Sequence, residues 1–271
     1  MKRPVLRVFA AAWFAATVSC DVSKDEEVAI GSETAQQMQN ELPIVNDPYI
    51  VSYINELGDT IASHTSRADL DWHFFIINSH QVNAFALPGG FIYVNRGLIE
   101  ATSRADELAG VLGHEIGHVI QRHSVEQMQN QKKVGAVAEI ACSLTNLCES
   151  QLGQAAINIG GTAVIARYSR ADELEADSEA VENVLRVNID PEGIPSLFEV
   201  LMQQRRTEPT IVDEWFSTHP LEESRIDHSR SLIARSGADH VSGLMQNIPS
   251  YAEFKRRVEL LPEPRELPRR R

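Results

Sequence analysis

Apolar side chains recur every three or four positions in the first part of the chain, which is the period of a helix with one buried face. This pattern covers residues 28–42 and 47–64. Asp47 followed by Pro48 is typical of a helix start, because aspartate caps free N–H groups and proline fits the first turn. The acidic residues 21–28 are expected to form a tether before the first helix.

The pattern then changes to short runs of aromatic and β-branched residues, which favour strands. Three such runs occur at residues 72–77, 83–87 and 91–94. The sequence Pro-Gly-Gly at residues 88–90 predicts a tight turn between the last two runs. We therefore expect a small sheet made of one hairpin and one neighbouring strand.

Helical periodicity returns after the third strand and continues almost to the end of the chain. The predicted helices cover residues 97–101, 104–130, 134–142, 151–169, 170–186, 191–206 and 221–235. Residues 262–271 are rich in proline and arginine and predict a disordered tail. The expected fold class is therefore α+β and mainly helical, with a small sheet.

Composition and charge exclude several classes of protein. The 271 residues are 43% hydrophobic and 23% charged, which is ordinary for a globular protein and excludes a fibrous or largely disordered chain. A formal net charge of −13 argues against nucleic acid as a partner, because phosphates need a basic surface. No apolar run reaches the roughly 20 residues of a membrane-spanning helix.

The N-terminus resembles a bacterial export signal. Basic residues are followed by a short apolar stretch at residues 8–16 and then by small residues that lead to Cys20. Residues 1–19 are therefore predicted to be a signal peptide of the lipoprotein type, in which Cys20 is lipidated and anchors the chain to a membrane. The alternative is an ordinary cleaved signal with an incidental cysteine. Either signal places the protein in the periplasm.

Export also implies an oxidising compartment, in which disulfides form. Cys142 and Cys148 are the cysteines other than Cys20. In one continuous helix they would lie about 9 Å apart along the axis, beyond the roughly 7 Å that a disulfide allows. They form a disulfide only if the chain turns between them, and otherwise they are two buried free thiols.

The motif H-E-I-G-H at residues 114–118 is the clearest chemical signal in the chain. Residues four positions apart share one face of a helix, so His114 and His118 can reach one Zn²⁺. Glu115 lies about 100° round the helix, beside the metal, where it can act as general base towards the attacking water. By the same count His123 lies about 180° from His114 on a continuous helix, and we expect it to be structural.

The helix that carries this motif also contains three glycines, Gly110, Gly113 and Gly117. Each lowers helix stability by about 1 kcal/mol relative to alanine. Their presence therefore indicates a packing or functional reason, such as the close approach of another backbone.

A third zinc ligand is expected from another segment, because hydrolytic zinc sites have three protein ligands and one open position. On the predicted helix 170–186, Glu173 and Asp177 share a side with small and apolar residues. Buried carboxylates need partners, and these would be the metal for Glu173 and an imidazole N–H for Asp177. The alternative is a helix with ordinary surface acids, like those on its opposite, solvated face: Glu175, Glu179 and Glu182.

Four motifs follow one another in the order known from one family of zinc endopeptidases. They are N-A-F-A-L-P-G-G at 83–90, H-E-I-G-H at 114–118, Y-S-R with E-x-x-x-D at 168–177, and S-T-H-P-L-E-E-S-R at 217–225. Residues 26–235 thereby resemble the gluzincin family of CAAX prenyl endopeptidase, heat-shock membrane proteases and periplasmic quality-control lipoproteins. The chain is similar to the short, stand-alone lipoprotein branch without C-terminal repeats.

The resemblance implies a domain organisation and a cofactor. A zincin-like metallopeptidase domain would span residues 20–235, with its small sheet beside the active-site helix, and residues 236–271 would form a C-terminal extension and tail. One Zn²⁺ per chain would be held by His114, His118 and Glu173, with Glu115 as the base.

The same resemblance implies roles for residues around the metal. His219 would lie near it, where it either stabilises the transition-state oxyanion or caps the zinc in a resting state; the alternative is a turn histidine before Pro220. Asp177 would orient a ligand histidine, and Arg225 would lie near the site, unless it is a surface or structural arginine.

The resemblance further implies how substrate binds. Asn83, Ala84, Phe85 and Ala86 would form an edge strand, to which an extended peptide adds through backbone hydrogen bonds. Such binding reads little sequence and suits misfolded or misassembled exported proteins as substrates. The resulting hypothesis is a cell-envelope zinc endopeptidase. The alternative is a latent or non-proteolytic chaperone-like factor for outer-membrane protein assembly. The sequence predicts no oligomeric state.

Overall fold

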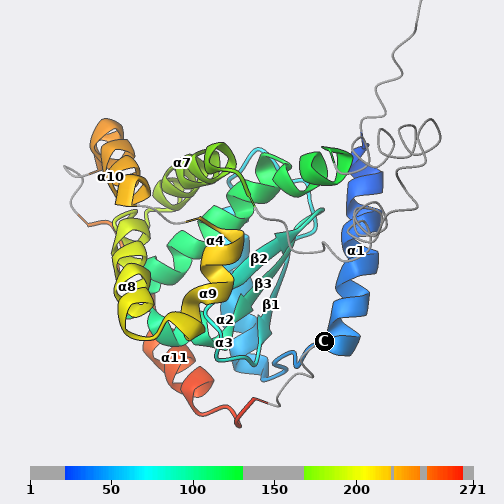
Figure 1. Ribbon diagram of the computed structural model, residues 1–271, viewed down its shortest axis with the longest axis horizontal. Helices are drawn as coiled ribbons and strands as arrows, with labels where there is room; N and C mark the ends of the chain where they lie inside the picture. The colour runs from blue at the N-terminus through cyan, green and yellow to red at the C-terminus, as the bar shows by residue number, and fades with distance from the viewer. Residues whose placement is uncertain (1–21, 131–167, 221–222, 239–242, 265–271) are drawn as a thin grey trace, which may run out of the picture.

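A small sheet lies beside the helix that carries the H-E-I-G-H motif (Figure 1). The computed structural model describes residues 22–130, 168–220, 223–238 and 243–264. The sheet has the order β1-β3-β2, with β1 at His73–Ile77, β2 at Ala84–Leu87 and β3 at Phe91–Asn95. β2 and β3 form an antiparallel hairpin, and β1 pairs with β3 in parallel. The prediction of one hairpin with one neighbouring strand is confirmed, and β2 lies at an edge.

The two N-terminal helices differ in how well the sequence predicted them. Helix α2 (Pro48–Ala62) begins as predicted, because the Asp47 carboxylate accepts hydrogen bonds from the first free N–H groups. Helix α1 (Lys24–Glu41) begins four residues before the predicted start. The expectation of a tether over residues 21–28 is therefore wrong for residues 24–28, which are helical. Ser23 and Glu26 form a capping box, which stabilises the earlier start.

The two faces of the sheet are covered by different helices (Figure 1). Side chains alternate between the faces of a strand. Phe85 and Tyr93 accordingly belong to a small core with Ala35 of α1. Ala84 and Ile92 point the other way, into the main core. Because the sheet is buried on both faces, β2 is held rigidly beside the motif helix.

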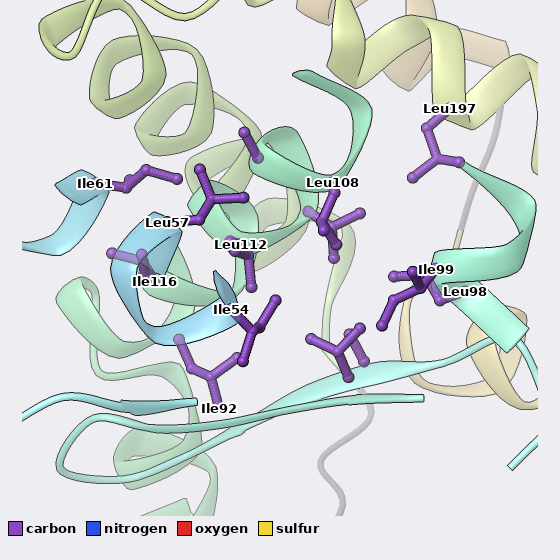
Figure 2. Packing of buried hydrophobic residues seen from close by; sticks show 14 of the residues in the cluster. Ile54, Leu57, Ile61, Ile92, Leu98, Ile99, Leu108, Leu112, Ile116 and Leu197 are labelled. Carbon is purple, nitrogen blue, oxygen red and sulfur yellow. The ribbon is translucent and has the colours of Figure 1, made fainter. Parts of the chain in front are cut away.

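The main core is formed where the motif helix meets α2 and the sheet. The motif lies on α4 (Ala105–Ile120), which follows the short helix α3 (Arg96–Ala101). Figure 2 shows Leu112 and Ile116 of α4 beside Ile54 of α2 and Ile92 of β3, and all four are buried. The face of α4 opposite the histidines is therefore fixed in an apolar core.

The prediction of one helix over residues 104–130 is wrong in its second half. α4 ends at Ile120, and a further helical stretch begins at His123. Arg122 between them has a φ of 61°, a left-handed conformation that interrupts the helix. This break changes the direction in which His123 points.

Helix α7 (Arg170–Arg186) crosses α4 at very short range. A Cβ atom on Gly117 would lie 3.0 Å from the Ala176 carbonyl oxygen, and one on Gly113 would lie 3.3 Å from the Ala180 Cα. Both glycines thus permit the contact of two backbones, which is the packing reason that the sequence indicated.

Four further helices complete the described part of the fold. Helices α8 (Gly193–Thr207) and α10 (Glu223–Ser236) are close to their predicted positions, whereas α9 (Pro209–Thr218) was not predicted. A further helix, α11 (Tyr251–Glu259), lies within the predicted C-terminal extension. Its Phe254 is fully buried and stacks on Tyr53 of α2 with the ring centroids 4.3 Å apart.

Several predictions concern residues outside those that the structure describes. They include the signal peptide and Cys20, the helices at 134–142 and most of 151–169, the pair Cys142 and Cys148, and the last part of the tail. Among the described residues, no helix is both long and apolar enough to cross a membrane. The predicted fold class, mainly helical α+β with a small sheet, is confirmed.

Candidate metal centre

Four buried side chains from three parts of the chain lie close together. His114 and His118 come from α4, Glu173 from the first turn of α7, and His219 from the end of α9. Each is at most 1% exposed. One potential ligand atom from each lies within 4.8 Å of those from the other three. The structure thus brings together the three predicted ligands and His219.

The spacing of the donor atoms fits a single zinc ion. The Nε2 atoms of His114 and His118 are 3.1 Å apart, and they lie 3.5 Å and 3.6 Å from the two carboxylate oxygens of Glu173. Two ligands of one tetrahedral Zn²⁺, each about 2.0–2.1 Å from the ion, are roughly 3.3 Å apart. Two imidazoles and one carboxylate are also a ligand set that catalytic zinc uses.

The charges around the site favour a cation. Burial alone lowers the pKa of His114, but the carboxylates of Asp177 and Glu173 outweigh burial and raise this pKa to about 9. Burial and the charge of His114 hold the pKa of His118 well below its usual value. Burial opposes ionisation of Glu173, yet the charges of His219 and Arg225 keep its pKa well below the usual range. Glu173 is therefore an ionised carboxylate, and His118 is a neutral imidazole.

Glu115 has the environment of a general base. Its carboxylate is fully buried, and neither of its oxygens has a hydrogen-bond partner among the residues that the structure describes. Oε1 lies 3.6 Å from Nε2 of His219. Burial raises the pKa of Glu115, because the charged form is poorly solvated. A buried carboxylate without partners is costly unless something else, such as a reacting water, completes its environment.

Asp177 and Arg225 contact the predicted ligands. Asp177 Oδ1 lies 3.0 Å from Nδ1 of His114, which is the contact expected for a carboxylate that orients a ligand imidazole. Arg225 donates to both Asp177 oxygens, from Nε at 2.8 Å and Nη2 at 2.6 Å, and its Nη1 pairs with Glu173. Arg225 is 3% exposed, so it is not a surface residue.

His219 faces both Glu173 and Glu115. It follows the last residue of α9, where its backbone N–H donates to the Trp215 carbonyl. Its Nδ1 lies 3.0 Å from Glu173 Oε1, and its ring stacks on Trp215 with the centroids 4.8 Å apart. The unpredicted helix α9 therefore fixes this histidine, whose position a simple turn would not define.

The predicted edge strand is present as β2, and Asn83 directly precedes it. Hydrogen-bonded and non-bonded residue pairs alternate along an antiparallel hairpin, and the Asn95 N–H donates to the Asn83 carbonyl. The backbone groups of Ala84 and Ala86 therefore point away from β3, although both residues are buried and the Ala86 carbonyl accepts a hydrogen bond from Ser124 Oγ at 3.4 Å. The Asn83 side chain donates to Glu214, while its buried Oδ1 has no hydrogen-bond partner in the described part of the chain.

Two residues beside His118 were not predicted to be part of the site. Nδ1 of His123 lies 2.8 Å from Nδ1 of His118, so the expectation that His123 points away from the metal is wrong. The reason is the break in the helix at Arg122. The ring of Tyr168 stacks on His118 with the centroids 3.7 Å apart, and its hydroxyl is 3.0 Å from Ser124 Oγ. Only the position of Tyr168 in the Y-S-R motif pointed to it.

An H-E-x-x-H helix, a buried glutamate from α7 beside its histidines and an edge strand nearby define a zincin-like metallopeptidase. The chain belongs to peptidase family M48, whose sequence pattern matches residues 48–233. Zinc is the metal that this family uses, and the four buried side chains are positioned to bind one ion.

Individual relatives cover the chain to different extents. It is 33% identical over 219 residues to the beta-barrel assembly-enhancing protease of Escherichia coli K12, an alignment that covers 78% of this chain and 44% of the relative. It is 28% identical over 217 residues to the metalloprotease LoiP of E. coli K12, with 77% of this chain and 81% of LoiP covered. The chain thus spans less than half the length of the beta-barrel assembly-enhancing proteases that it matches.

Proposed function

We propose that this chain is a zinc-dependent endopeptidase of the bacterial cell envelope that hydrolyses misfolded or misassembled exported proteins. The observation that carries the proposal is the buried carboxylate of Glu115, which has no hydrogen-bond partner among the described residues and lies next to the predicted ligands His114, His118 and Glu173. A merely structural metal site would be closed by four ligands and would need no such carboxylate.

The chain's own residues supply the proton transfers. Zinc, when bound by His114, His118 and Glu173, would polarise the scissile carbonyl and acidify the attacking water. Glu115 accepts the proton of that water and then donates it to the leaving amine. Burial raises its pKa, which brings the carboxyl closer to the neutral range in which one group serves as base and then as acid.

The edge of β2 provides the substrate site in this proposal. The N–H and C=O groups of Ala84 and the N–H of Ala86 would pair with an extended peptide, with Phe85 turned into the small core on the far face of the sheet. The Ala86 carbonyl already accepts a hydrogen bond from Ser124 Oγ at 3.4 Å. The unpartnered Asn83 Oδ1 would accept a further hydrogen bond from a substrate amide. These are main-chain contacts, so they select extended, unfolded segments rather than a particular sequence.

His219 supports a second candidate function. With His219 the centre has four potential ligands, whereas a hydrolytic site keeps one position open. A chain in which His219 is the fourth ligand would be latent, and it would act as a non-proteolytic factor in outer-membrane protein assembly. Otherwise His219 stabilises the oxyanion of the transition state.

The proposed location is the periplasm, with the chain attached to a membrane by lipid on Cys20. The signal-like residues 1–19 support this location, and so do relatives named as beta-barrel assembly-enhancing proteases. Incorporation of labelled palmitate into the parent chain, but not into a Cys20→Ser variant, would test the anchor.

Glu115→Gln tests the proposed activity. The amide has nearly the same shape but cannot accept a proton, so cleavage of unfolded casein should fall by about 10²- to 10⁴-fold. Zinc content should remain at one ion per chain, because Glu115 is not a proposed ligand. Glu173→Ala is the matched comparison, and it should lose both zinc and activity. Cleavage by the Glu115→Gln protein near the parent rate would refute the role of Glu115.

His219→Ala separates the two candidate functions. If His219 caps the metal, casein cleavage rises in this variant. If it stabilises the oxyanion, kcat falls by about 10²- to 10³-fold with zinc still bound. Binding of unfolded protein without cleavage, in both the parent and the variant, would favour the non-proteolytic factor.

A further inference from the structure

The two histidines of the motif are oriented by different neighbours. Nδ1 of His114 lies 3.0 Å from the buried carboxylate of Asp177. Nδ1 of His118 instead lies 2.8 Å from Nδ1 of a second imidazole, His123. His123 is 4% exposed, and its other nitrogen, Nε2, lies 3.2 Å from Oε2 of Glu175.

The proton positions along this row of side chains follow from simple chemistry. A neutral imidazole carries one proton, and Nε2 of His118 faces His114 and Glu173, where it must offer a lone pair to bind a metal. Its proton is therefore on Nδ1 and is donated to Nδ1 of His123. That assignment leaves the proton of His123 on Nε2, directed at Glu175. An ionised carboxylate only accepts hydrogen bonds, so Glu175 fits this end of the row.

Among the described residues, His123 is the one hydrogen-bond partner of His118 Nδ1. Tyr168 stacks on the ring face rather than on its edge, with an angle of 17° between the two ring planes. Without His123, the Nδ1–H would be buried and unpaired, and the ring would gain by placing its proton on Nε2 instead. That tautomer cannot bind a metal through Nε2.

We propose that His123, itself oriented by Glu175, is a positioning residue that holds His118 in the tautomer and ring orientation needed to bind zinc. Glu175 is 59% exposed in its side chain, so the row runs from the buried centre to the surface of α7. The inference concerns metal binding. It can hold or fail whether or not the chain cleaves proteins.

The first experiment compares His123→Leu with His123→Gln in the full chain, with zinc release into a chelator as the readout. Loss of such a supporting contact typically weakens metal binding by 10- to 100-fold, and we expect this for His123→Leu. A glutamine oxygen can accept from His118, and its NH₂ group can donate to Glu175. His123→Gln should therefore stay within about threefold of the parent. Equal loss in both variants, or none in His123→Leu, would overturn the proposal.

The second experiment remains informative if His123→Leu does not fold. Glu175→Ala removes the exposed end of the row, and Glu182→Ala is its matched control. Glu182 is on the same helix, its side chain is also 59% exposed, and it pairs with Arg186 instead. We expect zinc release to accelerate about three- to tenfold in Glu175→Ala and to be unchanged in Glu182→Ala. Equal rates in these two variants would contradict the role of Glu175.

The tautomer itself provides a readout that a purely structural role would not change. In ¹⁵N-histidine-labelled, zinc-loaded protein, the His118 proton should be on Nδ1 in the parent and in His123→Gln. In the metal-free His123→Leu protein, a larger share of His118 should carry its proton on Nε2 than in the metal-free parent. The same share in both metal-free proteins would refute the proposal.

Discussion

The close crossing of α4 and α7 predicts a specific effect of Gly117→Ala. The added methyl would lie 2.9 Å from Glu179 Cβ and 3.0 Å from the Ala176 carbonyl oxygen, whereas ordinary contacts begin at 3.4 Å. The Ala176 oxygen belongs to the backbone of α7, which also carries Glu173, and a backbone atom cannot swing aside as a side chain can. The two helices must therefore separate by a few tenths of an ångström. The proposed ligands are on these two helices, and the substitution therefore moves Glu173 away from the histidines.

The magnitude of the effect follows from two opposed contributions. Overpacking costs about 1–3 kcal/mol, and replacing glycine by alanine in a helix stabilises by about 1 kcal/mol. The net loss of unfolding free energy is then roughly 0–2 kcal/mol. Ligand distances in metal sites tolerate only about 0.2 Å, so we expect zinc affinity to fall by at least about tenfold.

Gly110→Ala is the matched control, because its methyl meets a different helix. It would lie 2.7 Å from Ile194 Cγ1 on α8, which carries none of the four candidate ligands. Urea unfolding and chelator competition for zinc should be measured on both variants. We expect comparable losses of stability but weakened zinc binding in Gly117→Ala alone. Parent-like zinc affinity in Gly117→Ala, or an equal loss in Gly110→Ala, would refute this account of the crossing.

Three further predictions concern the core, the start of α4 and the edge strand. Phe254→Ala should lower the unfolding free energy by about 3–5 kcal/mol in urea, because a fully buried ring is lost; a cost below 1 kcal/mol would mean that α11 is not part of the cooperative core. Burial alone raises the pKa of Glu107, but hydrogen bonds from the backbone of Ser103 and the hydroxyl of Ser196 outweigh it and lower this pKa. At pH values above the ordinary pKa of glutamate, Glu107→Gln should therefore lower the unfolding free energy by about 1–3 kcal/mol. The difference from the parent should shrink as the pH falls through the folded-state pKa of Glu107, and a difference independent of pH would contradict this. Asn83→Ala should raise KM for an unfolded substrate about three- to tenfold without changing zinc affinity, and an unchanged KM would exclude Asn83 from substrate binding.

Local patterns were sufficient for most of the fold. Helices with a clear apolar face and a capping residue, such as α2, were predicted within two residues. Helix α9 was missed because it is short and contains β-branched residues, although Pro209 at its start is a recognisable signal. Helix α11 also carries a signal, since Tyr251, Phe254 and Val258 recur with the helical period. The sequence analysis instead assigned this region to a C-terminal extension, because the residues that follow are rich in proline and predict a tail.

The candidate site was accessible to sequence reasoning where spacing on one helix determines geometry. His114 and His118 are four residues apart, and Glu173 and Asp177 are also four apart, so each pair shares one helical face. The distance between α4 and α7 could not be predicted, because the sequence does not show which backbone packs against the glycines of α4. His123 was missed for a related reason: its direction depends on a helix break without proline or glycine.

The break at Arg122 is stabilised by residues far away in the sequence. The Arg122 guanidinium pairs with Oε2 of Glu27 at 2.9 Å, and Arg67 pairs with Oε1 of the same carboxylate at 2.8 Å. Glu27 is 1% exposed, and a buried carboxylate is tolerated only with such partners. The start of helix α1, which the sequence predicted to be part of a tether, thus supplies the charge that holds the left-handed turn. Because that turn directs His123 towards His118, the N-terminal helix contributes to the orientation of the metal centre.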